Sequence, residues 1–337
     1  RRRSARMRIL LTGAQGQLGQ HLAQSCPDHV ELIATDRATD RHACDLSGRG
    51  AVFELLDAVQ PDCIVNPAAW TAVDAAEDHE DRALILNRDL PCWLSEWTQA
   101  RNAGLISYST DYVFDGEPGR GWTESDPCRP QSAYGRSKRA GEEALLAGRG
   151  RCLILRTAWL YSALPGNFLT AILKRAVQGH DLKVVADQIG SPTWAGTLAE
   201  ATWALLEPLA RFDGPSLMHV AGQGAMSWHE FAARAVDGAK QLRRVPESVR
   251  VEPIASDAWP QKARRPAWSV LDCSYFERVS GMTLPSVDDA LQECLQQWAE
   301  AALASLPACP SEALHAPGRR SVAGRKHGRT CHPRGQQ

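Results

Sequence analysis

A glycine-rich segment directly after a short apolar run is the feature of this sequence that most limits its fold. Met7 precedes Arg8-Ile9-Leu10-Leu11, in which we expect a first buried strand at Ile9–Leu11, and Thr12-Gly13-Ala14-Gln15-Gly16-Gln17-Leu18-Gly19 follows. Glycines spaced G-x-x-G-x-x-G allow a tight turn from a strand into a helix and let a bound diphosphate approach the backbone. We therefore expect a helix at about 17–25 and an α/β fold that binds a nucleotide.

The first half of the chain alternates short apolar runs with longer amphipathic ones. We expect strands at Glu31–Ala34, Cys63–Val65, Leu105–Ser109 and Leu153–Leu155, and helices at Val52–Val59 and at about 81–102. Strands and helices that alternate in this way are typical of a parallel sheet with helices on both faces. The predicted fold class is therefore α/β, with a Rossmann-type doubly wound parallel sheet.

The composition changes after about residue 160 and again near residue 307. Pro, Gly and Trp become frequent after 160, which predicts a smaller C-terminal substrate-binding lobe over the carboxyl edge of the sheet. The end of the chain is basic and has almost no apolar periodicity, which favours disorder over a role in binding a partner. The expected organisation is a Rossmann domain of residues 7–160 with about 183–210, a lobe of about 161–182 with 211–300, and disordered tails at 1–6 and 307–337.

The overall composition argues against several classes of protein. With 38 Lys and Arg against 39 Asp and Glu, the formal net charge is −1, and no basic stripe for nucleic acid appears in the body of the chain. No apolar run approaches the roughly 18 residues that a membrane helix needs, and no hydrophobic region follows the leading arginines as in a signal peptide. The ten cysteines form no C-x-x-C pair. This predicts reduced thiols in a cytoplasmic protein without a metal site.

Two acidic positions after the glycine-rich segment are candidates for holding an adenosine. Asp36 ends the second expected strand, 17 residues after Gly19, where a carboxylate would accept hydrogen bonds from ribose hydroxyls. Its neighbour Arg37 could bind a 2′-phosphate instead. Asp45-Leu46 could contact the adenine, and the alternative for Asp45 is a helix N-cap near Ser47. The sequence thus leaves both NADH and NADPH open as cofactors.

A tyrosine and a lysine four residues apart indicate the chemistry. Tyr134-Gly135-Arg136-Ser137-Lys138 places both side chains on one helix face, and Ser107–Phe114 leaves a strand with hydroxyl groups at its end. The ordinary pKa of a tyrosine is about 10, and a nearby ammonium together with an oxidised nicotinamide lowers it. We interpret Tyr134 as the proton donor, Lys138 as the group that tunes it and holds the cofactor ribose, and Thr110 as a hydrogen-bond partner of the phenol or the substrate carbonyl. The pattern predicts an NAD(P)H-dependent oxidoreductase.

Six motifs between residues 7 and 300 follow one another in the order of a known family. They are Leu10–Gly19, Asn66–Asp74, Ser109–Phe114, Tyr134–Lys138, Arg156–Trp159 and Asp187–Thr193. In these motifs the chain resembles the dTDP-4-dehydrorhamnose reductase family of extended short-chain dehydrogenases. The resemblance implies that NADPH or NADH reduces the 4-keto group of dTDP-4-dehydro-L-rhamnose, giving dTDP-L-rhamnose for cell-surface polysaccharide. It implies a dTDP-sugar as the binding partner, and a homodimer is a possible assembly.

By matching position, the resemblance assigns roles to individual residues. The diphosphate would contact the glycine-rich segment, Asp36 the ribose, and Asp45 with Leu46 the adenine. The residues assigned to cofactor binding are Gly13, Gly16, Gln17, Leu18, Gly19, Asp36, Arg37, Asp45, Leu46, Ala69, Trp70, Thr71, Tyr134 and Lys138. Thr110 and Asp111 would contact the sugar, and Trp159 would pack on it. The expected catalytic residues are Tyr134, Lys138 and Thr110.

The sequence departs from the family pattern at two places. Pro67 stands where the family usually has alanine, and His21 stands where some members carry a glutamate that binds magnesium at a dimer contact. We therefore expect no metal. Thr110 is followed by Asp111-Tyr112, without the Asp-Glu pair of dehydratases, and another epimerase or reductase of the extended family is the first alternative. The second is a non-catalytic subunit, like the regulatory subunit of methionine adenosyltransferase.

Overall fold

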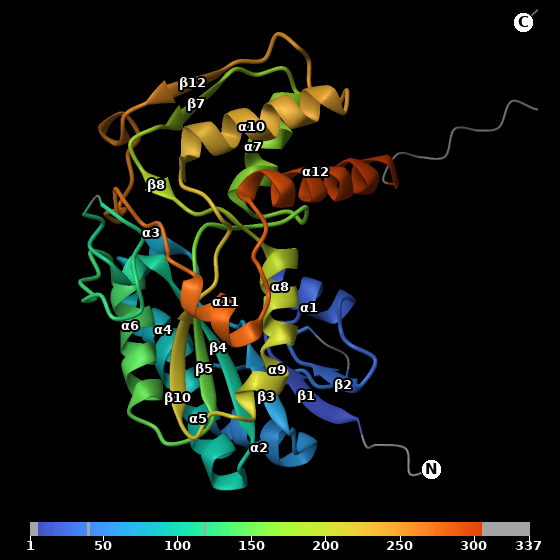
Figure 1. Cartoon of the computed structure of the whole chain (residues 1–337), viewed down its shortest axis with the longest axis vertical. Coiled ribbons are helices and arrows are strands. Elements are labelled where there is room, and N and C mark those ends of the chain that lie inside the picture. The colour runs from blue at the N-terminus through green and yellow to red at the C-terminus, as the bar shows by residue number, and fades with distance from the viewer. Residues whose placement is uncertain (1–5, 39–40, 118, 305–337) are drawn as a thin grey trace, which may run out of the picture.

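The chain folds into a layered sheet region with a smaller lobe above one end of the sheet (Figure 1). The computed structural model describes residues 6–38, 41–117 and 119–304. Apart from Arg6, the tails expected at 1–6 and 307–337 lie outside the described residues. In this part of the chain, no helix has both the length and the apolar character needed to cross a membrane.

Six parallel strands form the central sheet, in the order β10-β5-β4-β3-β1-β2. Their bounds are β1 Met7–Leu11, β2 Val30–Ala34, β3 Cys63–Asn66, β4 Gly104–Thr110, β5 Cys152–Thr157 and β10 Pro215–His219. The order reverses between β1 and β3, and in open α/β sheets ligands bind at such a switch point, beyond the carboxyl ends of the strands. The predicted doubly wound parallel sheet is confirmed.

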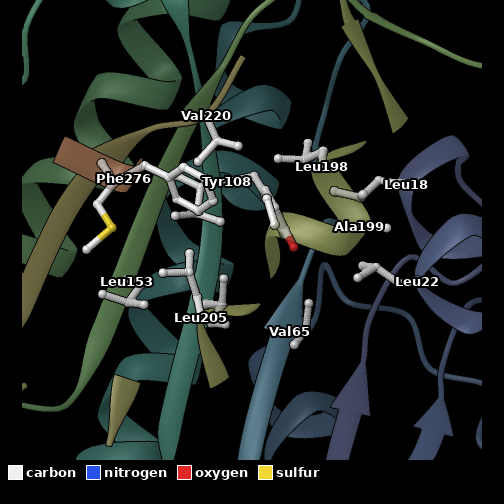
Figure 2. Close-up of a cluster of buried hydrophobic side chains, with 14 of the residues drawn as sticks. Leu18, Leu22, Val65, Tyr108, Leu153, Leu198, Ala199, Leu205, Val220 and Phe276 are labelled. Carbon is white, nitrogen blue, oxygen red and sulfur yellow. The ribbon is translucent and has the colours of Figure 1, made fainter. Parts of the chain in front are cut away.

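Helices cover both faces of this sheet because successive strand residues point to opposite sides. Ile9 and Leu11 of β1 belong to one core, together with residues of α1, α8, α9 and α11, and Leu10 belongs to the other, with residues of α2, α5 and α6. Figure 2 shows the first core, where the side chain of Tyr108 lies among leucines of α1 and α8. The helix bounds are α1 Gln17–Gln24, α2 Arg49–Val59, α5 Leu90–Arg101, α6 Ala133–Leu146, α8 Ala195–Ala204, α9 Leu206–Leu209 and α11 Ser274–Ser280.

The helical stretch expected at about 81–102 contains a π-helical turn. The chain runs through α3 Val73–Ala76, α4 Glu80–Leu84 and the π turn η1 Ile85–Asp89 before α5. Pro91, in the first turn of α5, has no N–H to donate to the carbonyl of Asn87, so the α-helical pattern cannot continue there. Helix α6 passes close to this turn at Gly141, where an added Cβ would lie 2.0 Å from the Asn87 carbonyl oxygen. The turn thereby brings Asn87 against α6.

The lobe has its own core, formed mainly by three helices and short two-stranded pairings. Its elements are β6 Leu160–Tyr161, α7 Phe168–Val177, β7 Leu182–Val185, β8 Ile189–Gly190, β9 Thr193–Trp194, β11 Met226–Ser227, α10 Trp228–Gln241, β12 Val251–Ile254, η3 Ser256–Ala258 and α12 Val287–Ala304. Strand β7 pairs with β12, whereas β10 joins the main sheet beside β5. The strand pairing therefore joins β7 to the lobe and β10 to the main sheet, which differs from the domain boundaries expected near residues 183 and 211.

Candidate active site

The carboxyl ends of the parallel strands bring most of the predicted site residues to one edge of the sheet. Thr12 follows β1, Asp36 lies just beyond β2, and Thr110 ends β4. At the switch point, the Thr12 hydroxyl donates to Asn66 Oδ1 at 2.6 Å, and both side chains are buried. The Ala68 N–H also donates to the Thr12 oxygen, at 3.4 Å. This network joins the glycine-rich segment to the segment after β3.

Two glycines of the glycine-rich segment have no room for a side chain. Gly13 has a φ of +55°, and a Cβ there would lie 2.9 Å from Ala68 Cα. A Cβ on Gly19 would lie 2.3 Å from the Gly13 carbonyl oxygen. The compact turn leads directly into α1, whose first turn has no side-chain cap. An uncapped first turn offers amide hydrogens to an anion, so this segment fits the diphosphate of a dinucleotide.

The other three residues of this segment with an expected cofactor role differ in their surroundings. Gln17 is partly buried, and its Oε1 accepts a 2.9 Å hydrogen bond from the Ser162 hydroxyl, which lies at the entrance to the lobe. Leu18 points into the core shown in Figure 2, so only its backbone is available to a ligand. Gly16 donates its N–H to the Gly13 carbonyl at 3.0 Å and closes the turn.

The two acidic candidates for adenosine binding occupy different turns. Asp36 accepts hydrogen bonds from the backbone N–H groups of Gln15 at 3.3 Å and Arg37 at 2.7 Å, which ties it to the glycine-rich segment. Arg37 is exposed. Asp45 accepts from the N–H and hydroxyl of Ser47, and these hydrogen bonds lower the pKa of its carboxyl group. The N-cap of α2 is Gly48, not Asp45, so the N-cap alternative is wrong.

The side chain of Leu46 faces the core beside α2 and is buried. Its side chain is therefore not available for the expected apolar contact with an adenine. The segment Ala69, Trp70 and Thr71 follows β3 and lies partly or fully exposed at the sheet edge.

A buried asparagine that the sequence analysis did not identify links the Trp70 backbone to α6. Asn87 Oδ1 accepts from the Trp70 N–H at 2.9 Å, and its Nδ2 donates to the Trp70 carbonyl at 3.1 Å. The same Nδ2 donates to Ser137 Oγ at 2.9 Å, between the predicted catalytic residues Tyr134 and Lys138. Asn87 thereby holds the segment after β3 and helix α6 together. The signal that could have identified Asn87 is its place four residues before Pro91, which interrupts the hydrogen-bonding pattern of the expected helix.

Thr110, Asp111 and Tyr134 meet at the end of β4. The Thr110 hydroxyl donates to Asp111 Oδ1 at 3.0 Å, and a side-chain hydrogen bond links Thr110 to Tyr134. Tyr134 is partly buried, and its ring lies edge to face with that of Tyr112 at 5.8 Å between ring centres. Burial raises the pKa of Tyr134 well above its ordinary value, and the hydrogen bond with Thr110 opposes part of that rise. The phenol is therefore neutral at pH 7 and keeps the proton that an acid catalyst needs.

The expected lowering of the Tyr134 pKa by Lys138 is not found in the protein alone. Lys138 is buried, and its Nζ donates a 3.0 Å hydrogen bond to the Tyr108 carbonyl oxygen. Burial lowers the pKa of Lys138 to about 8, and the carboxylate of Glu142 opposes this shift. The lysine is thus anchored to β4, on the same face of α6 as Tyr134, without ion-pairing to the phenol.

Trp159 lies just after β5 in a left-handed conformation, with a φ of +47°. A non-glycine residue adopts this conformation only where its surroundings hold it there. Its indole stacks on that of Trp228, with ring centres 3.5 Å apart and planes 2° apart. The indole also lies close to Gly190, where a Cβ would lie 2.4 Å from it. Trp159 is partly exposed and joins the sheet region to the lobe.

Arg265 makes a second contact with the sheet region, near Tyr112. Arg265 donates to the Asp74 carboxylate at 3.0 Å, and its guanidinium lies 5.8 Å from the centre of the Tyr112 ring. Lys262 also pairs with Asp78. Nothing in the sequence indicated a role for Arg265 or Lys262, because a charged residue carries no signal of a partner that is distant in the sequence.

The buried carboxyl group of Asp111 makes stability depend on pH. Burial raises its pKa to about 6, although hydrogen bonding with Thr110 opposes the rise. Ser269, which lies close to Asp111 in space, also opposes the rise in pKa. Neither Ser269 Oγ nor Asp111 Oδ2 makes a hydrogen bond of normal geometry. The folded state therefore binds this proton more tightly than the unfolded chain, whose aspartates have a pKa of about 3.9, and the contribution of Asp111 to stability falls as the pH rises from about 4 to 6.

We expect Asp111→Asn to be more stable than the parent chain by about 1–3 kcal/mol at pH 7, because the amide avoids the charged, desolvated form. The gain should disappear near pH 4, where the parent carboxyl is protonated in the folded state. Urea unfolding at the two pH values measures this difference. An equal effect at both would mean that the substitution acts through packing instead of charge.

Among the described residues, no group of three or more His, Cys, Asp and Glu could hold a metal ion. Eight cysteines lie in this part of the chain, and all eight are free. His21, at the position where some family members would carry glutamate, is buried against the Trp194 ring, and burial lowers its pKa.

Comparisons with known proteins agree with this geometry. A family model described as RmlD substrate binding domain matches residues 7–300. The chain is 37% identical over 303 residues to a dTDP-4-dehydrorhamnose reductase of Burkholderia thailandensis, covering 86% of this chain and 98% of that protein. The structure is similar to that of a dTDP-4-dehydrorhamnose reductase from Clostridium acetobutylicum, with a TM-score of 0.78, 34% identity, and coverage of 86% and 99% of the two chains.

A third similar protein was solved with a dinucleotide. The dTDP-4-dehydrorhamnose reductase of Bacillus anthracis, in complex with NADP, has a TM-score of 0.78 and 29% identity, with 87% of this chain and 99% of that chain covered. The family model and the curated relative both extend over most of the sequence, including every motif on which the resemblance depends. The chain therefore belongs to the dTDP-4-dehydrorhamnose reductase family.

Proposed function

We propose that this protein reduces the 4-keto group of dTDP-4-dehydro-L-rhamnose to give dTDP-L-rhamnose, with NADPH or NADH as the reductant. The observation that carries the proposal is the neutral phenol of Tyr134, hydrogen-bonded to Thr110 at the carboxyl end of β4. This is the edge of the sheet where the glycine-rich segment lies. The names of the relatives supply the substrate.

The residues of the glycine-rich segment fit a dinucleotide. The crowding around Gly13 and Gly19 and the uncapped start of α1 leave backbone amides for a diphosphate. The relative solved with NADP supports this assignment. When bound, the reduced nicotinamide supplies the hydride. Residues proposed to hold the dinucleotide include Gly16, Gln17, Leu18, Asp36, Arg37, Asp45, Ala69, Trp70, Thr71 and Lys138.

The chain itself supplies the proton and the orientation of the sugar. Tyr134 donates its phenolic proton to the oxygen at C4 as that carbon accepts the hydride, so that the carbonyl becomes a hydroxyl group. Thr110 orients the phenol through their hydrogen bond. We assign Asp111 and Trp159 to holding the sugar, since one lies beside Thr110 and the other joins the sheet region to the lobe. Lys138 stabilises the phenolate that remains, and solvent reprotonates it.

Oxidation of NADPH on addition of dTDP-4-dehydro-L-rhamnose tests the proposal, with the corresponding keto-sugars of other nucleotides as comparison. A reductase consumes one NADPH for each keto-sugar. An epimerase of the extended family would interconvert nucleotide sugars without net consumption of NADPH, and a non-catalytic subunit would bind the dinucleotide without turnover. Either result would overturn the assignment. A cytoplasmic location and assembly as a homodimer stay predictions.

The choice between the two dinucleotides gives a separate prediction. Asp36 suits a free 2′-hydroxyl and Arg37 suits a 2′-phosphate, so we expect both cofactors to work, with kcat/KM differing by less than about 100-fold. Asp36→Asn should shift the preference toward NADPH while keeping an acceptor for the Gln15 N–H. Arg37→Ala should shift it toward NADH.

Steady-state kinetics with both cofactors measure the ratio. Glu31→Gln, an exposed change on the same strand, is the matched control and should leave the ratio unchanged. If either Asp36→Asn or Arg37→Ala has no effect on the ratio, the adenosine ribose does not lie at the end of β2.

A further inference from the structure

A buried ion pair lies directly behind the lysine of the proposed site. Glu142 follows Lys138 by one turn of α6, and its carboxylate accepts from Arg156 Nε and Nη2, both at 2.7 Å. Each of these two side chains is only 1% exposed. Arg139 donates to the same carboxylate at 3.0 Å. Burying such a pair costs several kcal/mol in desolvation, so it is weak evidence of a stabilising role.

A small cavity of about 10 Å³ lies between the two side chains of α6 and the sheet. Lys138 and Glu142 line it from α6, and Ser107, Tyr108 and Ser109 line it from β4. Lys138 Nζ donates to the Tyr108 carbonyl at this place, and Ser109 Oγ has no hydrogen-bond partner of normal geometry. A polar cavity of this size accommodates one water molecule, which needs two to four polar partners.

We propose that Glu142 is a positioning residue for Lys138: its carboxylate, fixed by Arg156, is the counter-charge that keeps the ammonium group protonated and directed toward the proposed cofactor site. A water molecule in the cavity would join Lys138, Ser109 and Glu142. The inference rests on the proposed function, because it concerns the lysine of that site.

The charges around Lys138 favour this role for Glu142 over any neighbour. Burial lowers the pKa of Lys138 to about 8, and Glu142 is the charged group that opposes this shift. On β5, Arg156 pairs with Glu142. On β10, His219 lies against Arg156, and burial lowers the pKa of this histidine to about 4, so His219 is neutral at pH 7.

The remaining titratable groups act elsewhere. Asp111, on the 3₁₀ turn η2 Asp111–Val113, hydrogen-bonds Thr110 and raises the pKa of Tyr134. Cys128 Sγ accepts a 3.1 Å hydrogen bond from Arg156 Nη2, which also donates to Glu142. Tyr108 presents its backbone carbonyl to Lys138, while its side chain lies on the opposite face of the sheet (Figure 2).

The test replaces Glu142 with glutamine, which keeps the hydrogen-bonding shape and removes the charge. Opposite charges at close range typically shift a pKa by about 1–3 units, so the pH above which activity is lost should fall by about one unit. At pH 9 the activity should be about tenfold lower than in the parent chain, because one pKa unit is a tenfold change in protonated lysine. The matched control is Glu143→Gln, an exposed neighbour that pairs with Arg139 and should leave the profile unchanged.

A second readout is the affinity for NADPH as a function of pH, measured by binding. Its loss at high pH should shift to lower pH in Glu142→Gln in the same way as the activity. If the parent chain binds NADPH but reduces no keto-sugar, the proposed function fails, and the binding profile still tests Glu142. A folded Glu142→Gln variant with both profiles unchanged would overturn the inference.

A double variant, Glu142→Gln with Arg156→Met, separates positioning from stability. Removing one partner of a buried pair leaves an uncompensated charge, whereas removing both charges avoids that cost. The double variant should therefore unfold at a higher temperature than Glu142→Gln, while keeping its shifted pH profile. Recovery of the parent profile together with stability would mean that Glu142 is only structural and would contradict the proposal.

Discussion

Replacing Tyr134 with phenylalanine should lower kcat by about 10²–10⁴-fold, the usual contribution of a positioned acid, with little change in affinity for NADPH. Phenylalanine keeps the ring that lies edge to face with Tyr112 and removes only the hydroxyl bonded to Thr110. Because burial keeps this phenol neutral, its proton is available throughout the neutral range. Single-turnover and steady-state rates with the keto-sugar nucleotide measure the loss.

Tyr108→Phe is the matched control, since it removes the hydroxyl group of a tyrosine whose side chain lies on the other face of the sheet. The Tyr108 hydroxyl lies 2.7 Å from Thr202 Oγ1, in the core shown in Figure 2. Losing this buried hydrogen bond should cost about 1 kcal/mol of stability and leave turnover near the parent value. A Tyr134→Phe variant that keeps most of its activity would remove this residue from the mechanism.

Gly19→Ala should weaken NADPH binding by at least about tenfold and lower the free energy of unfolding by about 1–3 kcal/mol, as overpacking does. The new methyl group would lie 2.3 Å from the Gly13 carbonyl oxygen and 2.8 Å from Ala14 Cα. Both contacts are backbone atoms, so the turn itself has to open. Opening it moves the amides at the start of α1 away from a bound diphosphate.

Gly50→Ala in α2 is the control for this substitution. A Cβ at Gly50 meets nothing within 4 Å, and alanine in a helix should stabilise the chain by about 0.5–1 kcal/mol. Titration of NADPH fluorescence and thermal unfolding of both variants give the comparison. Equal affinities for NADPH in the two variants would show that the cofactor does not lie on the glycine-rich segment.

The sheet could be predicted from the sequence because each strand carries a local signal. Five apolar runs mark β1 to β5, and the observed bounds extend the expected ones by one or two residues, as at Cys152–Thr157. The placement of Tyr134 and Lys138 on one face of a helix was also predictable, since they lie four residues apart. Strand β10 was missed, and its residues were expected in the lobe, because Pro215–His219 is a partly polar edge strand with weak periodicity.

The features that the sequence did not reveal depend on contacts between distant segments. The partner of Arg156 is Glu142, and Trp159 stacks on Trp228 at the start of α10. No local pattern specifies either pairing. The direction of the Tyr134 pKa shift was also missed, because burial by surrounding segments outweighs the effect of a lysine that is bonded to the Tyr108 carbonyl instead.

In the proposed reaction, hydride passes from NADPH to C4 of the sugar while Tyr134 protonates the oxygen. NADPH carrying deuterium at the transferring position of the nicotinamide, incubated with dTDP-4-dehydro-L-rhamnose, tests it most directly. Mass spectrometry and NMR of the product should find one deuterium, at C4 of dTDP-L-rhamnose, for each NADPH consumed, and Tyr134→Phe should slow its appearance about 10²–10⁴-fold. A sugar product without deuterium, formed while the NADPH stays intact, would contradict the account.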